Sequence, residues 1–209
     1  MTETRRVAAV IPVASIEGAK TRLGETLDAE ERHDLVSGLL DRTLGAVTGA
    51  TTVADVLVVS PDRDVLAIAA EAGARTLRQR SKGLNAGVRD GRDDVISGGA
   101  DSVVVVPLDL PFITAAAIDA VVAALIAGAG PTVLVVPDRH GSGTNILGLR
   151  PPDVIDVSFG IGSREAHRTA AVAAGAEFVE LDGPLTVDLD TPDDLVFIET
   201  FEPDGLHVG

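Results

Sequence analysis

Apolar runs at four places in the chain have the pattern of buried strands. Residues 103–106 are four consecutive valines, so neither face of a strand built from them alternates to polar side chains. Strands of that kind lie inside a parallel sheet that is covered on both faces. Similar runs occur at 7–13, 55–60 and 132–136, and we expect a short additional strand at 75–77.

The segments between these runs have helical spacing. After Asp28, apolar residues recur every three or four positions between acidic ones, at Leu35, Val36, Leu39, Leu40, Leu44 and Val47. Further helices are predicted at 62–72, from Asn85 onward, at 114–127, at 163–174 and after Thr191. This alternation predicts a three-layer α/β/α domain with a mostly parallel sheet. Residues 133–149 are expected to add a small antiparallel extension at one edge.

The composition narrows the classes of partner. A chain of 209 residues can bury one sizeable core, so we expect a single domain over residues 1–209 with its core at about 7–198. It has no run of about 18 apolar residues, which argues against a membrane partner. The absence of cysteine excludes disulfides and favours a cytoplasmic protein. A net charge of -15 argues against nucleic-acid binding, so an anionic ligand would need a local site.

Three aspartates follow predicted strands. Asp109 comes directly after the valine run, where open α/β sheets bind ligands, and it is either a metal ligand or the cap of its own turn. If residues 186–190 form a strand, Asp188 and Asp190 share a face with Cα atoms about 6.6 Å apart. Like charges so placed repel unless a cation lies beside them. These three hard oxygen ligands suit Mg²⁺, or Mn²⁺, with open positions for substrate phosphates.

Several other polar residues each have two interpretations. Lys20 and Arg22, after the first strand, either bind a polyphosphate or are solvated charges. Asn85 either caps a helix or reads a base edge. Gly141 and Gly143 either turn backbone amides toward an anion or form a hairpin turn.

The segment around Ser163 and the histidines is equally open. Ser163 fits a helix N-cap, and the glycines before it would also suit an anion site at the helix N-terminus. His140 and His167 are each the lone histidine of their segment, so we interpret them as surface residues rather than acid–base groups. Asp193 and Asp194 are predicted to stabilise the start of the last helix.

An ordered set of motifs resembles a known family. The motifs are K-T-R-L at 20–23, L-N at 84–85, L-D-L-P at 108–111, G-S-G-T at 141–144, F-G at 159–160 with Ser163, and V-D-L-D-T-P at 187–192. In this order they are similar to those of the 2-phospho-L-lactate or phosphoenolpyruvate guanylyltransferases of coenzyme F-420 biosynthesis, over about residues 7–198. The resemblance implies a GT-A-like, Rossmann-like nucleotidyltransferase that joins GTP to a small phosphorylated acid and releases pyrophosphate.

The resemblance also implies roles for individual residues. It places Mg²⁺ on Asp109, Asp188 and Asp190. It places the phospho-acid on Lys20, Thr144, Gly160 and Ser163, and the nucleotide on Leu84, Asn85 and Asp109. Lys20, Arg22 and Asp109 would be catalytic, and no general base is needed because a phosphate dianion is already a nucleophile.

The sequence leaves alternatives open for the acceptor substrate and for the class of reaction. The composition looks bacterial and favours phosphoenolpyruvate over 2-phospho-L-lactate or 3-phosphoglycerate. A sugar-phosphate nucleotidyltransferase and a nucleotide-binding regulator without turnover are the competing interpretations, although residues 14–19 lack the glycine-rich loop of many sugar-phosphate nucleotidyltransferases. A homodimer is left open.

Overall fold

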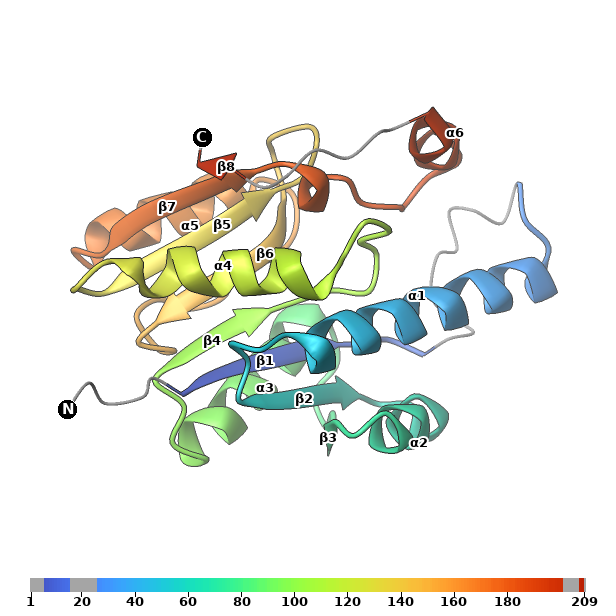
Figure 1. Ribbon diagram of the computed structural model, residues 1–209, viewed down its shortest axis with the longest axis horizontal. Helices are drawn as coiled ribbons and strands as arrows, with labels where there is room; N and C mark the ends of the chain where they lie inside the picture. Colours follow the sequence, from blue (N-terminus) through green and yellow to red (C-terminus); the bar gives the residue numbers. More distant parts are fainter. Residues whose placement is uncertain (1–5, 16–25, 201–206, 209) are drawn as a thin grey trace.

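The computed structural model describes residues 6–15, 26–200 and 207–208. Its elements alternate between strand and helix along most of the chain (Figure 1). The strands are β1 (Val7–Pro12), β2 (Asp55–Ser60), β3 (Arg75–Arg78), β4 (Ser102–Val105), β5 (Thr132–Pro137), β6 (Thr144–Arg150), β7 (Glu177–Asp182) and β8 (His207–Val208). The helices are α1 (Ala29–Gly49), α2 (Arg63–Glu71), α3 (Leu84–Ser97), α4 (Ala115–Ala127), α5 (Ser163–Ala173) and α6 (Pro192–Thr200), with a short 3-10 turn, η2 (Pro184–Thr186).

The strands form one sheet in the order β3-β2-β1-β4-β6-β5-β7-β8. Pairings β1–β2, β1–β4, β2–β3 and β5–β7 are parallel, and those made by β6 are antiparallel. The predicted α/β/α class with a mostly parallel sheet is therefore confirmed. Among the described residues, no helix is both long and apolar enough to cross a membrane.

Both faces of the central strands are covered. In β4, Val104 belongs to the hydrophobic cluster that α1, α2 and α4 share, while Val103 and Val105 belong to the cluster that α3 and α5 share. All three valines are fully buried or nearly so. The continuous valine run is thus explained by burial on both faces, as the sequence predicted.

Local sequence signals place most helix ends. Asp28 accepts hydrogen bonds from the N–H groups of Glu30 and Glu31, and the Glu31 carboxylate in turn accepts the N–H of Asp28, which forms a capping box before α1. Thr114 caps α4 by accepting the N–H of Ala117. These caps begin the helices where the sequence predicted them.

Strand β6 corrects the predicted position of the antiparallel segment. It lies inside the sheet, between β4 and β5, rather than at an edge. Residues 145–150 are all buried, which fits a strand with a neighbour on each side. At the centre of β6, a Cβ on Gly148 would lie 3.2 Å from side-chain atoms of Leu125 and Leu134. The absence of a side chain at Gly148 therefore allows Leu125 of α4 to pack closely against the strand. The hairpin pattern identified one neighbour, β5, but contained no signal for the second.

Residues 186–190 are the other correction. The structure has a 3-10 turn at 184–186 and an extended segment after it that belongs to no strand. The strand that precedes this segment is β7, which the sequence interpretation missed. Its burial pattern is mostly partial, which weakens the hydrophobic signal.

Candidate functional site

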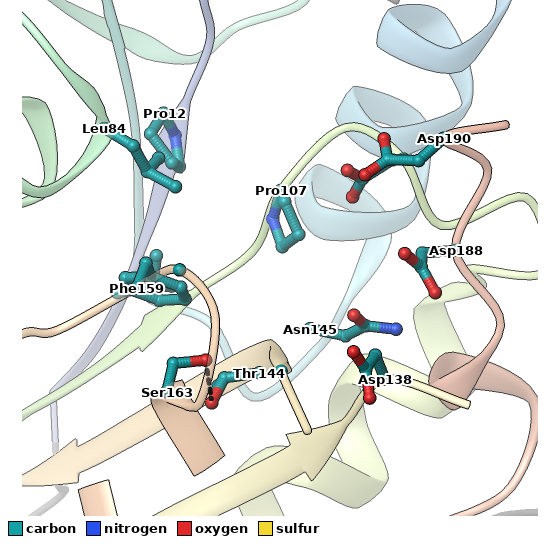
Figure 2. A pocket seen from close by; sticks show the side chains of 14 residues that line it. Pro12, Leu84, Pro107, Asp138, Thr144, Asn145, Phe159, Ser163, Asp188 and Asp190 are labelled. Carbon is teal, nitrogen blue, oxygen red and sulfur yellow. Dashed lines mark hydrogen bonds between the residues drawn. The ribbon is translucent and has the colours of Figure 1, made fainter. Parts of the chain in front are cut away.

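A cavity of about 190 Å³ opens at the carboxyl ends of β1, β4 and β5. Figure 2 shows Asp138, Asp188 and Asp190 along one side of it, Pro12, Leu84 and Phe159 along the other, and Thr144 with Ser163 at the base. Most of the residues singled out from the sequence line it: Leu84, Asp109, Gly143, Thr144, Phe159, Gly160, Ser163, Asp188 and Asp190. The fold therefore brings together segments more than 100 positions apart, at the strand ends where open α/β sheets form their ligand crevices.

The acidic segments are tied to each other by backbone. The N–H of Leu189 donates to the carbonyl of Asp109 at 2.9 Å, which places the loop after β4 beside the segment that carries Asp188. Asn145 on β6 holds the same segment in place, because its buried side-chain amide donates to the carbonyls of Leu185 and Thr186, at 3.0 Å each. The sequence interpretation did not assign Asn145 to the site.

The carboxylates repel one another. Burial raises the pKa of Asp188 to about 6, and repulsion from the nearby Asp109 and Asp190 contributes to the same shift. A hard divalent cation would neutralise the negative charge of carboxylates clustered in this way. Within the described ranges, no three acidic or histidine side chains are grouped closely enough to ligate one ion by themselves. A Mg²⁺ ion at this place would therefore need further ligands, such as the phosphate oxygens of a substrate.

Asp109, Asp188 and Asp190 form the acidic wall of the cavity, and Asp194 fixes the part of this wall at Asp190. Its buried carboxylate accepts from the N–H groups of Asp190 (2.9 Å) and Thr191 (2.7 Å) and pairs with Arg139. Although burial opposes ionisation, these hydrogen bonds lower the pKa of Asp194. The predicted stabilising role of Asp194 at the start of α6 is confirmed, and the same contacts hold Asp190 in place.

The base of the cavity is a chain of hydroxyls that ends on a buried histidine. Ser163 Oγ lies 3.1 Å from Thr144 Oγ1, which lies 3.1 Å from Nδ1 of His167. The Nε2 atom of His167 accepts the N–H of Ser158 at 3.1 Å. The interpretation of His167 as a surface residue is wrong: its exposure is 0% and burial lowers its pKa to about 4. His140 is exposed, as predicted.

The capping interpretations of Asn85 and Ser163 are also wrong, because glycines occupy the two N-cap positions. Gly83 (φ 95°) precedes α3 and Gly162 (φ 75°) precedes α5, so Asn85 and Ser163 lie inside the first turns. Asn85 instead clamps the loop before α5: its amide donates to the carbonyl of Phe159 at 3.0 Å and accepts the N–H of Phe159 at 2.7 Å. The positive φ angles explain why glycine, rather than a polar cap, occupies both positions.

The glycines at 141 and 143 form a hairpin turn. The N–H of Gly141 donates to the carbonyl of Asp138, and the N–H of Ser142 donates to the Asp138 carboxylate at 2.8 Å. The amides of Gly141 and Ser142 are thus used within the turn, which supports the hairpin interpretation of this segment. Asp138 also lines the cavity, and the sequence interpretation did not identify it.

A larger cavity adjoins the first. It measures about 540 Å³ and is lined by residues 12–15, Pro61 and residues 79–84. Pro12 and Leu84 line both cavities and form their shared wall. The larger cavity falls in the size range of small-molecule sites. Lys20 and Arg22, which the sequence places after β1, lie outside the described residues.

Comparisons with known proteins identify the family. Residues 7–202 match the family described as "Guanylyl transferase CofC like". The chain is 45% identical, over 94% of its length and 94% of the relative, to a phosphoenolpyruvate guanylyltransferase from Sphaerobacter thermophilus. It is 30% identical, over 91% of its length and 81% of the relative, to a 2-phospho-L-lactate guanylyltransferase from Methanocaldococcus jannaschii.

A solved structure supports the fold. A protein from Desulfovibrio desulfuricans assigned as a nucleotide-diphospho-sugar transferase superimposes with a TM-score of 0.76, at 17% identity, over 94% of this chain and 87% of its own. The cavity lies at the strand ends of a mostly parallel sheet, and the family match covers nearly the whole chain. These two observations establish the reaction class. The chain belongs to the CofC-like guanylyltransferase family and is a nucleotidyltransferase.

Proposed function

We propose that this enzyme condenses GTP with a small phosphorylated acid, phosphoenolpyruvate before 2-phospho-L-lactate or 3-phosphoglycerate, and releases pyrophosphate, as a step of coenzyme F-420 biosynthesis. The observation that carries the proposal is the pair of adjoining cavities that share a wall of Pro12 and Leu84. The larger would accommodate a nucleoside, and the smaller would offer its hydroxyls and carboxylates to a compact phospho-acid. The names of the relatives support the same pair of substrates.

The chemistry that this arrangement supports is a direct transfer. A phosphate oxygen of the acid forms a bond to the α-phosphorus of GTP while the bond from that phosphorus to the bridging oxygen of pyrophosphate breaks. The phosphate nucleophile is already ionised, so the residues act by orientation and charge neutralisation. Thr144, Ser163 and the Gly160 backbone would hold the acid, Leu84 and Asn85 would border the nucleotide, and Lys20 with Arg22 would balance the charge of the departing pyrophosphate.

We infer a divalent cation on the acidic wall. Asp109, Asp188 and Asp190 would hold Mg²⁺, with Mn²⁺ as a substitute, and the ion would neutralise phosphate charge when bound. Asn145 and Asp194 serve this wall indirectly, by fixing the backbone that carries Asp188 and Asp190.

The test is pyrophosphate release from GTP with Mg²⁺, measured in parallel with phosphoenolpyruvate, 2-phospho-L-lactate, 3-phosphoglycerate and a panel of sugar phosphates. We expect release only when GTP, the metal and a phospho-acid are all present. Release with a sugar phosphate alone would instead assign a sugar-phosphate nucleotidyltransferase. GTP binding by calorimetry without release for any acceptor would make the protein a regulator.

A further inference from the structure

The hydrogen-bond partners of His167 fix which of its ring nitrogens carries the proton. The Ser158 N–H is a backbone amide and can only donate, so Nε2, at 3.1 Å, must accept. Burial keeps the ring neutral by lowering its pKa to about 4. A neutral imidazole that accepts at Nε2 carries its proton on Nδ1, and that proton points to the hydroxyl oxygen of Thr144, 3.1 Å away.

The proton on Nδ1 sets the polarity of the next two groups. Thr144 Oγ1 accepts from the imidazole, so its own hydrogen is free to go to Ser163 or to the cavity. The Ser163–Thr144 contact of 3.1 Å uses one of the two hydroxyl hydrogens, whichever residue supplies it. The other hydrogen remains, and both hydroxyls line the cavity. The pair therefore presents a donor to the bound molecule, which suits an anionic oxygen.

The opposite tautomer would give the opposite result. With the proton on Nε2, Nδ1 would take the hydrogen of Thr144. Ser163 would then have to donate to Thr144, and the cavity would receive only lone pairs from the two hydroxyls. Lone pairs would repel a phosphate or carboxylate. The contact between Ser158 and His167 thus decides whether the base of the cavity attracts or repels an anion.

The ring is held in this orientation from several sides. Its exposure is 0%, and the Phe159 ring packs edge-on against it with centroids 5.5 Å apart at 74°. Phe159 is itself clamped by the two hydrogen bonds that its backbone makes with the Asn85 side chain, donating one and accepting the other. A ring flip would leave the Ser158 N–H facing a carbon atom inside a packed site, which is costly.

We propose that His167 is a positioning residue: by donating Nδ1–H to Thr144, it makes the hydroxyl pair of Thr144 and Ser163 a hydrogen-bond donor for an anionic oxygen of the small acid. This inference rests on the proposed function for the identity of the acid. The tautomer itself does not depend on that identity.

The first test is the ¹⁵N NMR spectrum of the full-length wild-type protein without substrate at neutral pH. The chain has four histidines, and the His167 signals are those absent from a His167→Asn sample. We expect a protonated Nδ1 and an unprotonated Nε2. A protonated Nε2 would overturn the proposal, whatever the enzyme's substrates prove to be.

The second test separates donation from packing with two variants. In His167→Asn, the side-chain amide nitrogen can take the place of Nδ1 and keep the donor to Thr144. In His167→Gln, the amide reaches the place of Nε2, so the Ser158 contact is kept and the donor is lost. We expect His167→Gln to raise KM for the phospho-acid about tenfold or more, and His167→Asn to raise it about threefold or less, with KM for GTP little changed in both.

The matched control is His33→Gln, an exposed position on α1, which should leave both KM values unchanged. Equal effects of the Asn and Gln variants on KM for the acid would overturn the proposal. If a variant at 167 does not fold, as judged by circular dichroism, the wild-type NMR spectrum still decides the tautomer. Failure of every phospho-acid in the pyrophosphate assay, together with a protonated Nδ1, would refute the proposed function and leave the polarity of the hydroxyl pair standing.

Discussion

Asp188 is the residue at which the site most clearly lowers the stability of the protein. Its carboxylate is half-buried, with Asp109 and Asp190 near it, and its pKa is raised to about 6. A group in this state destabilises the protein without a bound cation, because at neutral pH its ionised form is partly removed from water and is also repelled by the neighbouring carboxylates. Residues that serve function commonly reduce stability in this way.

We predict that Asp188→Asn raises the melting temperature at pH 7 and abolishes pyrophosphate release. The amide keeps the shape of the carboxylate and removes the repulsion. Mg²⁺ should raise the melting temperature of the wild type more than that of the variant, in thermal melts with and without the metal. An equal response to Mg²⁺ would contradict the assignment of Asp188 as a ligand.

Asn85 tests two interpretations of one side chain. Its amide group is used by both backbone groups of Phe159, so we interpret it as a clamp on the loop before α5. We predict that Asn85→Ala raises KM for the phospho-acid about tenfold, because the loop that carries Gly160 loses its anchor. Steady-state kinetics with each substrate varied in turn measures this. A change in KM for GTP alone would show that the amide reads the base instead.

At the scale of elements, the β5–β6 hairpin positions Thr144 through a turn built on Asp138. A Cβ on Gly143 would lie 2.7 Å from Asp138 Oδ2, on the carboxylate that accepts from Ser142. We predict that Gly143→Ala lowers the free energy of unfolding by about 1–3 kcal/mol and raises KM for the acid. Urea denaturation and kinetics measure the two effects.

Gly45→Ala is the matched control. Gly45 lies on α1, and a Cβ at this position would have nothing within 4 Å, so alanine should be neutral or stabilising by up to about 1 kcal/mol. If Gly143→Ala behaved like this control, the close approach of Asp138 would not determine the turn.

The elements also show what the sequence could and could not predict. Burial on both faces produced continuous apolar runs, so β2, β4 and β5 were predicted nearly to the residue, as was α4 from its Thr114 cap. The neighbours of β6 depend on pairing between distant segments, which local patterns do not encode. β7 was missed because most of its residues are only partly buried.

In the site, too, residues with a local signal were predicted from the sequence, and residues whose role depends on distant segments were missed. Asp109, Asp188 and Thr144 were found because their chemistry or motif is visible locally, and the structure places them in one cavity. His167 and Asn145 were missed because their burial depends on what the rest of the chain packs against them. A lone histidine gives no local signal that distinguishes a buried ring from an exposed one.

For the whole molecule, two perturbed groups give opposite pH dependences of stability. His167 is neutral in the fold with its pKa lowered from 6.5 to about 4, so the unfolded chain binds more protons and stability falls as pH drops from about 6.5 to 4. Asp188 has its pKa raised from 3.8 to about 6, so the folded protein binds more protons and stability rises over a drop from about 6 to 3.8.

We therefore predict that a substitution at either residue removes that residue's contribution to the pH dependence of stability. His167→Asn should make the melting temperature fall less between pH 6.5 and 4 than it does in the wild type, and Asp188→Asn should make it fall more. Melting curves at half-unit pH steps measure this. Parallel curves for all three proteins would contradict the assigned protonation states.

In the proposed reaction, a phosphate oxygen of the acid attacks the α-phosphorus of GTP at this cavity. The most direct test uses phosphoenolpyruvate with ¹⁸O in its phosphate group, unlabelled GTP and Mg²⁺, with the products analysed by mass spectrometry. We expect a guanylylated acid that retains every ¹⁸O atom of the acceptor phosphate, and pyrophosphate that carries none. Label in the pyrophosphate, or a guanylylated product that has lost label, would contradict it.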